Sequence, residues 1–171
     1  MAGITCARAA DNVRVTVNSN VTEGSCDISG PATQRFTVGY LGSDFTPAQR
    51  TVETMRLDIR VSNCHGNAPG RHPAILVTGA LLAGETDIFA DSASVATNVG
   101  VAVRQGVYSG PLSSFYTPGQ MVSQANPQTY VNQINTVQGG IYPYTLGLVS
   151  NGSTPGLGQV KATLMFEFKY Q

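Results

Sequence analysis

His65, His72, Asp87 and Asp91 are the side chains of this 171-residue sequence that come nearest to a metal site or an acid–base pair. The two histidines are the only ones in the chain and lie seven residues apart in a segment rich in Gly and Pro, which is typical of a surface loop. Asp87 and Asp91 flank Phe89 in a loop-like stretch, where we expect solvated carboxylates rather than a proton-transfer pair. The sequence therefore predicts no metal site.

The sequence motifs of other catalytic and nucleotide-binding classes are also missing. No serine occupies a Gly-x-Ser-x-Gly turn, and no glycine-rich phosphate loop follows a predicted strand. We therefore predict that the protein is not an enzyme and needs no cofactor.

The three cysteines, Cys6, Cys26 and Cys64, indicate one disulfide and one spare thiol, because their number is odd. Cys26 begins one predicted strand and Cys64 ends another, so we expect these two to pair; two unpaired buried cysteines are the alternative. A disulfide indicates an oxidising compartment and hence export. Closing a loop of this length stabilises the fold by about 4 kcal/mol in the chain-entropy model.

The N-terminus contains a pattern typical of a signal-peptidase site, Ala7-Arg8-Ala9 before Ala10-Asp11. The six residues before this pattern are too few for the charged and apolar parts of a signal peptide. Either residues 1–9 are the remnant of a processing segment, which we favour, or Cys6 belongs to a genuine tail. No run of 18 apolar residues predicts a transmembrane helix.

Composition excludes several classes of partner. Ten Lys and Arg balance ten Asp and Glu, only 12% of residues are charged, and no basic run occurs. Nothing in this pattern attracts nucleic acid or an anionic membrane. At 42% apolar residues the chain is too hydrophobic to be disordered. We expect partners to be recognised by shape, apolar surface and backbone hydrogen bonds.

Alternating apolar and polar residues predict strands at both ends of the chain. In residues 12–22, Val13, Val15, Val17, Ser19 and Val21 share one face. In residues 158–171, one face carries six residues: Val160, Ala162, Leu164, Phe166, Phe168 and Tyr170. These are the two most regular strand patterns in the sequence.

The segments between them predict further strands and one long loop region. Strand patterns occur at residues 36–40, 57–61, 74–77, 99–103 and 142–148. Residues 105–140 are rich in Gln and Asn and predict long loops, with one short strand at residues 130–134. About seven strands at this spacing predict an all-β sandwich.

The first strand could remain in the domain or leave it, because Glu23-Gly24-Ser25 separates it from Cys26. If it left, the last strand would expose an unpaired edge, which is an aggregation hazard. The strand of another chain could fill that place by β-augmentation.

The sequence resembles pilin subunits of the chaperone–usher pathway, close to those of type 1 fimbriae. The resemblance covers Ala10 to Gln171 and rests on four segments: Ala10-Asp11 with Val15-Thr16-Val17-Asn18 before Cys26, the strand from Leu57 to Cys64, the apolar Gly-containing segment from Ala96 to Gln105, and the C-terminal strand from Gly158 with its penultimate Tyr170.

The resemblance implies an incomplete immunoglobulin-like β-sandwich that a donor strand from another subunit or a chaperone completes. Residues 10–22 would be the donor-strand extension and residues 23–171 the pilin domain. The donor residues would be Val13, Val15, Val17, Ser19 and Val21, and the wall of the acceptor groove would be Val160, Ala162, Leu164, Phe166, Phe168 and Tyr170. Pilins usually have Gly where Ser19 stands, so a buried hydroxyl there would need a partner.

The resemblance also implies partners and a location. The partners would be other pilin subunits, a periplasmic chaperone and an outer-membrane usher, and the subunit would reach a fimbrium on the bacterial surface through the periplasm. There it would support adhesion as a structural subunit of the rod or tip.

Two alternatives predict different behaviour. A tip adhesin would contact a host glycan or protein through residues 105–140, with Tyr108, Tyr116 and Tyr130 able to stack on sugars. A complete sandwich with unrelated extracellular duties would be a stable monomer that needs no chaperone.

Overall fold

The computed structural model describes residues 8–10, 13–18, 26–36, 39–66 and 68–171. These residues form short and long strands and two short 3-10 helices, η1 (Gly42–Asp44) and η2 (Leu112–Ser114). The strands are β1 (Arg8–Ala10), β2 (Val13–Asn18), β3 (Asp27–Ser29), β4 (Thr33–Arg35), β5 (Tyr40–Leu41), β6 (Thr51–Ser62), β7 (Pro73–Gly79), β8 (Val99–Gln105), β9 (Gln128–Thr129), β10 (Gly140–Ser150) and β11 (Val160–Tyr170). The prediction of an all-β protein is confirmed.

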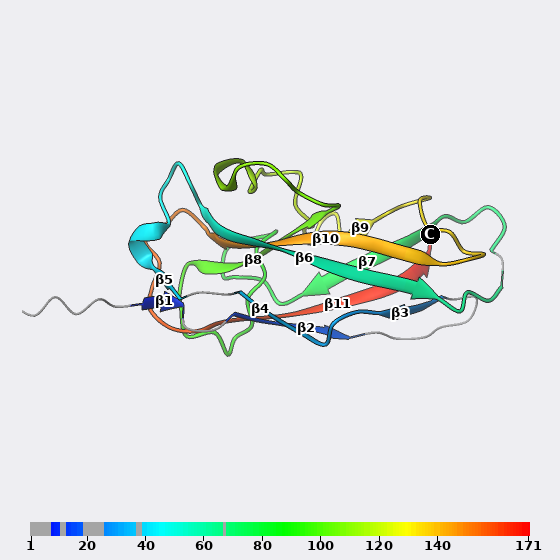
Figure 1. Cartoon of the computed structure of the whole chain (residues 1–171), viewed down its shortest axis with the longest axis horizontal. Coiled ribbons are helices and arrows are strands. Elements are labelled where there is room, and N and C mark those ends of the chain that lie inside the picture. The colour runs from blue at the N-terminus through cyan, green and yellow to red at the C-terminus, as the bar shows by residue number, and fades with distance from the viewer. Residues whose placement is uncertain (1–7, 11–12, 19–25, 37–38, 67) are drawn as a thin grey trace, which may run out of the picture.

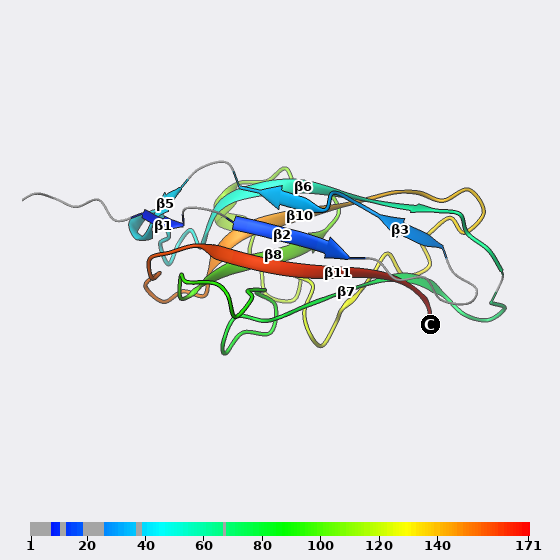
Figure 2. The ribbon, with the colours of Figure 1, turned by 90° about the horizontal axis from the view of Figure 1, so that it is seen from below.

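Two sheets pack face to face as a sandwich (Figures 1 and 2). One sheet has the order β3-β6-β10-β8 and the other the order β4-β2-β11-β7-β9, while β1 and β5 form a separate pair. The chain changes sheets between β3, which pairs with β6, and β4, which pairs with β2. This switch lets one short stretch of chain close both sheets on the same side.

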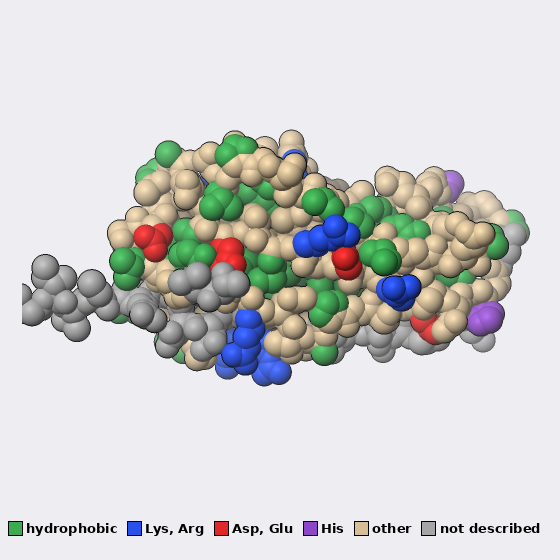
Figure 3. Space-filling view, in the orientation of Figure 1, with side chains coloured by type: hydrophobic (Ala, Val, Ile, Leu, Met, Phe, Trp, Pro, Cys, Tyr) green, Lys and Arg blue, Asp and Glu red, His purple; other side chains and the backbone are tan. Residues whose placement is uncertain are grey.

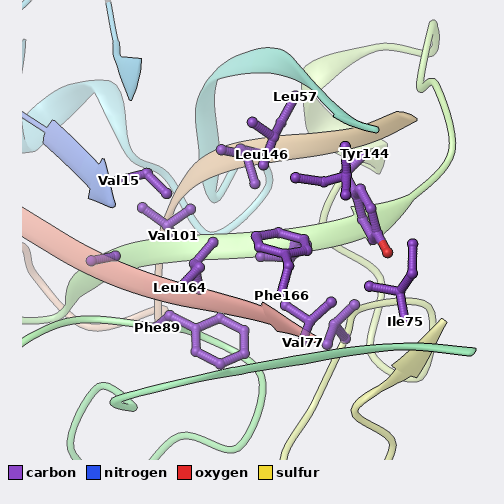
Figure 4. Close-up of a cluster of buried hydrophobic side chains, with 14 of the residues drawn as sticks. Val15, Leu57, Ile75, Val77, Phe89, Val101, Tyr144, Leu146, Leu164 and Phe166 are labelled. Atoms are coloured by element: carbon purple, nitrogen blue, oxygen red, sulfur yellow. The ribbon is translucent and has the colours of Figure 1, made fainter. Parts of the chain in front are cut away.

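The core lies between the two sheets, where side chains from both inner faces meet (Figure 4). Leu57 of β6 and Leu146 of β10 face Leu164 and Phe166 of β11, and all four are fully buried. Along β11 the pattern of burial alternates from Val160 to Phe168, as its sequence predicts. The regular alternation thus reflects a strand with one face in the core.

β8 and β10 are buried on both faces over most of their length. The segment after β8 folds back over the outer face of its sheet and buries Phe115 and Met121 there. Phe115 packs with Ala102 of β8 and Val149 of β10 in a second, smaller apolar cluster. The first part of the Gln- and Asn-rich region, which includes η2, therefore covers this sheet, whereas β9 pairs with β7 of the other sheet.

Two predicted strands lie elsewhere than expected. The pattern at residues 36–40 does not form one strand, because β4 ends at Arg35 and β5 begins at Tyr40; residues 37–38 lie outside the described part. The strand expected at residues 130–134 is displaced to Gln128–Thr129. Tyr130 and Asn132 both have positive φ, of 50° and 60°, and this left-handed backbone cannot continue a strand.

The expected disulfide is present. Cys26 and Cys64 are bonded, and they join the start of β3 to the end of β6 across a sequence separation of 38 residues. Asn63, beside Cys64, adds a hydrogen bond from its Nδ2 to the Asp27 carboxylate at 2.9 Å. The beginning of β3 is thereby fixed to the end of β6, its neighbour in the same sheet, at two adjacent points.

Candidate functional site

The candidate site is the strand position between β11 and β4, which the chain fills with its own β2. β2 runs parallel to β11, with Val13 beside Val160, Val15 beside Ala162 and Val17 beside Leu164. On its other side β2 runs antiparallel to β4. The resemblance implies that a strand of another subunit or of a chaperone lies at this position. In the single chain, β2 from the N-terminal segment pairs with β11 there instead.

The buried wall of the site is formed by β11. Val160, Ala162, Leu164, Phe166 and Phe168 are 0–3% exposed. Val15 of β2 is fully buried against this core, whereas Arg14 is exposed. At Arg14 and Val15, whose side chains are described, the apolar residue lies in the core and the charged residue in solvent.

The other edge of β11 is completed by β7 and by the loop that follows β7. β7 pairs with β11 from Leu164 to Tyr170. Before Leu164, the loop after β7 supplies the hydrogen bonds to this edge of β11. The Asp91 amide donates to the Lys161 carbonyl at 2.7 Å. Ser94 Oγ donates to the same carbonyl and accepts from the Lys161 amide, both at 2.9 Å. The edge facing β2 is thus the one at which an inserted strand completes the sheet.

Aromatic side chains hold the far end of the wall in place. The rings of Tyr144 and Phe166 meet edge to face at 5.1 Å. The Tyr144 hydroxyl bonds Thr129 Oγ1, which in turn donates to the Ile75 carbonyl at 2.9 Å. Burial raises the pKa of Tyr144 well above its ordinary value, so this hydroxyl stays protonated and keeps the network intact.

The structure brings together most of the residues that the sequence singled out. Val13, Val15 and Val17 align with the first half of β11. Ser19, Val21 and Cys6 lie outside the described residues. Tyr170 is only partly buried and packs its ring against Phe168 at 5.1 Å, at the end of the wall. Arg8–Ala10, which the sequence divides between a processing remnant and the extension, forms β1 beside β5.

The three tyrosines considered for sugar stacking are used within the chain. The Tyr108 hydroxyl donates to the Pro111 carbonyl, that of Tyr116 to Asp87, and that of Tyr130 to the Pro143 carbonyl. Arg50 and Arg104 lie over the rings of Tyr116 and Tyr108 at 4.2 and 4.8 Å. Their contacts fasten the cover of residues 106–130 to the sandwich.

Asp87 and Asp91 have structural roles that the sequence did not reveal. Asp87 is only 8% exposed and accepts the Tyr116 hydroxyl at 2.8 Å. Asp91 accepts from the amide and hydroxyl of Thr163 at 2.9 and 2.7 Å. The expectation that both carboxylates are solvated is therefore wrong, because distant strands supply donors that a local pattern cannot show.

His65 and His72 are exposed, as expected for loop residues. In the described ranges, no three His, Cys, Asp or Glu side chains gather in a group able to hold a metal ion. Among the same residues, no helix has the length and apolarity needed to cross a membrane.

Comparison with known proteins shows the fold. No protein-family model matches the sequence, and no curated protein matches it. Among solved structures, the chain is similar to the P pilus rod subunit PapA, with a TM-score of 0.56 and 21% sequence identity over 90% of this chain and 97% of that one. The chain therefore has the immunoglobulin-like β-sandwich fold of a pilus subunit.

Proposed function

We propose that this chain is a structural subunit of an adhesive surface fimbria and that it polymerises by donor-strand exchange. The observation that carries this proposal is β2: a strand from the N-terminal part of the chain fills the position between β11 and β4, beside a buried apolar wall on β11. β2 can leave this position together with the short strand β1 once β1 separates from β5, and the strand of a second copy can enter it by backbone pairing.

The chemistry of the wall explains why the site must always be filled. The inward face of β11 from Val160 to Phe168 is apolar, and its edge presents unpaired backbone groups whenever β2 is absent. An open apolar edge of this kind aggregates in water. We infer that the chain's own strand, a periplasmic chaperone and another pilin subunit occupy it in turn, with an outer-membrane usher as the place of exchange.

The disulfide supports the same assignment. Its presence fits a protein that folds in the periplasm and functions on the cell surface. It also marks where the detachable part ends, because Cys26 fixes the chain to β6 just beyond residues 19–25. The proposed role is structural, with binding partners and no catalytic step.

Thermal unfolding of the chain lacking residues 1–22, with and without a synthetic peptide of residues 11–22, tests this proposal. We expect a slow and large rise in melting temperature with the peptide, because binding to the folded state alone stabilises it. The control peptide has Val15→Asp, which would place an unpaired charge in the core and should give no rise.

A truncated chain that is already as stable as the full chain, and is unaffected by the peptide, would contradict donor-strand exchange. That result would identify the protein as a complete sandwich to which β2 adds little.

A further inference from the structure

The turn before β10 exposes a valine at its tip. Val137 is 89% exposed, the highest value among the large hydrophobic side chains in the described part of the chain. Turns usually carry Gly, Asn, Asp, Ser or Pro, each of which suits the bent backbone, and valine has no such role there. Val131 and Ile141, which precede and follow the turn in the sequence, are also exposed. Residues 131–141 thus offer several apolar side chains to a partner.

Hydrogen bonds hold Val137 in one position. The Asn135 side-chain oxygen accepts from the amides of Val137 and Gln138, both at 2.9 Å. The Asn135 carbonyl accepts from the Gly139 amide at the same distance. The turn is tied to the core because the Asn135 amide donates to the hydroxyl of the buried Tyr142 at 2.7 Å. A side chain carried by a fixed turn loses little conformational freedom on binding, which favours its insertion into a pocket.

A hollow of about 500 Å³ lies beside the loop that follows β7. Its apolar lining comes from Leu81, Leu82, Ala83, Ala90 and Ala96. Leu81 and Leu82 are only partly buried, and Ala83 is exposed, so part of this lining is open to an occupant. The loop itself hydrogen-bonds β11 on the side away from β2, so the hollow is distinct from the strand position between β11 and β4.

The polar side chains of the hollow favour an apolar occupant, because three of them already have partners within the chain. Asp91 and Ser94 form their hydrogen bonds with residues of β11. The Asn98 side-chain amide donates to the Thr154 carbonyl at 2.9 Å. The surface left for a partner is therefore mainly that of the leucine and alanine side chains.

The turn and the hollow lie toward opposite ends of the long axis of the molecule. Figures 1 and 2 show the loop of residues 80–98 in the half that carries β1 and β5, and the start of β10 at the other end. Val137 therefore cannot enter the hollow of its own chain, whereas the same side chain of a second copy can.

The charges near the two surfaces are complementary. The loop of residues 80–98 contains Glu85, Asp87 and Asp91 and has no Lys or Arg. Arg60 of β6 is aligned with Ile141, close to the turn in sequence, and is exposed without an ion pair to any described residue. Figure 3 shows Lys and Arg side chains among hydrophobic ones over the half of the molecule in which β6 ends and β10 begins. Opposite charges of this kind orient two copies as they meet.

We propose that the turn carrying Val137 in one copy inserts into the hollow beside residues 80–98 of a second copy. A side chain that fits a pocket elsewhere on the same chain forms a head-to-tail contact, which builds open rows of molecules when the rotation does not close. The contact joins folded copies and uses no strand of either one. It therefore goes beyond the exchange of strands proposed above.

Cross-linking between two single-cysteine variants of the full chain tests the contact. Both chains carry Cys6→Ala, and one adds Val137→Cys while the other adds Ala83→Cys; the disulfide-bonded cysteines do not react with maleimides. A short bis-maleimide should join these two chains several-fold more often than a pair in which Val107→Cys replaces Val137→Cys. Val107 is the matched control, because it is a 59% exposed valine outside the turn. Equal yields from the two pairs would overturn the proposal.

Sedimentation equilibrium of the full chain measures the strength of the contact. Val137→Ser should weaken association about tenfold, the change that corresponds to about 1.4 kcal/mol, whereas Val107→Ser should leave it unchanged. Arg60→Glu should also weaken association, and adding Glu85→Lys should recover part of the loss, because opposite charges then face each other again. Unchanged melting temperatures verify that these surface variants fold. Association that Val137→Ser does not weaken, or that Glu85→Lys does not recover, would contradict the contact.

The contact and the exchange of strands can be tested apart. Preferred cross-linking of Val137→Cys to Ala83→Cys, in a protein whose truncated form gains no stability from the peptide of residues 11–22, would sink donor-strand exchange and keep the end-to-end contact. Peptide-stabilised chain that assembles into filaments, but shows no preferred cross-link and no effect of Val137→Ser, would do the reverse.

Discussion

Single residues with partners from distant elements fasten the cover to the sandwich. Tyr116 is the clearest case, because its hydroxyl donates to the buried Asp87 at 2.8 Å while the Arg50 guanidinium lies over its ring. Arg50 in turn donates from Nε to the Ser150 carbonyl at 2.8 Å, at the end of β10. A tyrosine, an aspartate and an arginine from three parts of the sequence thus form one small network.

This network makes stability depend on alkaline pH. Burial, together with the hydrogen bond to Asp87, raises the pKa of Tyr116 to about 12 from an ordinary value of 10.0. Between these values the unfolded chain loses the phenolic proton and the folded chain keeps it, so stability present below pH 10 is lost as the pH rises toward 12.

We predict that the free energy of unfolding, measured by urea denaturation, falls between pH 10 and pH 12. Tyr116→Phe should show a smaller fall than the unmodified chain, because it removes one of the groups responsible. Tyr40, Tyr130 and Tyr144 also have raised pKa values and will keep part of the dependence. An identical fall in both proteins would mean that Tyr116 does not titrate in this range.

At the scale of elements, the cover on β8 and β10 depends on a close approach of ring and backbone. A Cβ atom added at Gly147 would lie 2.1 Å from the ring of Phe115. Phe115 is fully buried and anchors the second apolar cluster. The absence of a side chain at position 147 therefore lets the Phe115 ring approach the backbone of β10 closely.

Gly147→Ala should lower the free energy of unfolding by about 1–3 kcal/mol, the usual cost of overpacking a well-packed region. Replacing the ring as well, in Phe115→Leu with Gly147→Ala, should recover part of the loss relative to the sum of the two single changes. Denaturant titration of the three variants measures this coupling, and strict additivity would show that ring and strand do not press on each other.

At the scale of the whole molecule, the proposed exchange requires that β2 separate from the rest of the sandwich. β2 is joined to the rest through residues 19–25, and Cys26 then fixes the chain to β6. The other strands of the two sheets all follow Cys26 in the chain. A molecule that can both lend this strand and receive another has a head-to-tail contact, which generates open filaments rather than closed rings when the rotation does not close.

The chain lacking residues 1–22 should therefore act as a terminator of assembly. It retains the wall on β11 but has no strand to give, so each incorporated copy can accept a donor and cannot extend the filament from its other end. Adding it to assembling full-length chain should shorten filaments in proportion to its mole fraction, as measured by light scattering and electron microscopy. The variant Arg14→Gln with intact residues 1–22 is the control and should not terminate.

How much the sequence predicted depended on whether a pattern was local. β11 matches its prediction from Val160 to Tyr170 because alternation is a property of neighbouring residues. The strand expected at 130–134 failed because Tyr130 takes a left-handed backbone, held by bonds to Gln105 and Pro143 that are distant in sequence. Asp87 and Asp91 were misjudged for the same reason, since their donors are Tyr116 and Thr163.

The sequence by itself determined the all-β class, the two regular terminal strands, the cysteine pair and the apolar face of β11, because composition and period-2 alternation specify which residues a strand can bury. Only the tertiary structure decided that β2 lies parallel to β11 in its own chain, with Arg14 beside Lys161. Alternation is the same in both directions along a strand, so it determines which face is buried and does not determine the direction in which the strand runs.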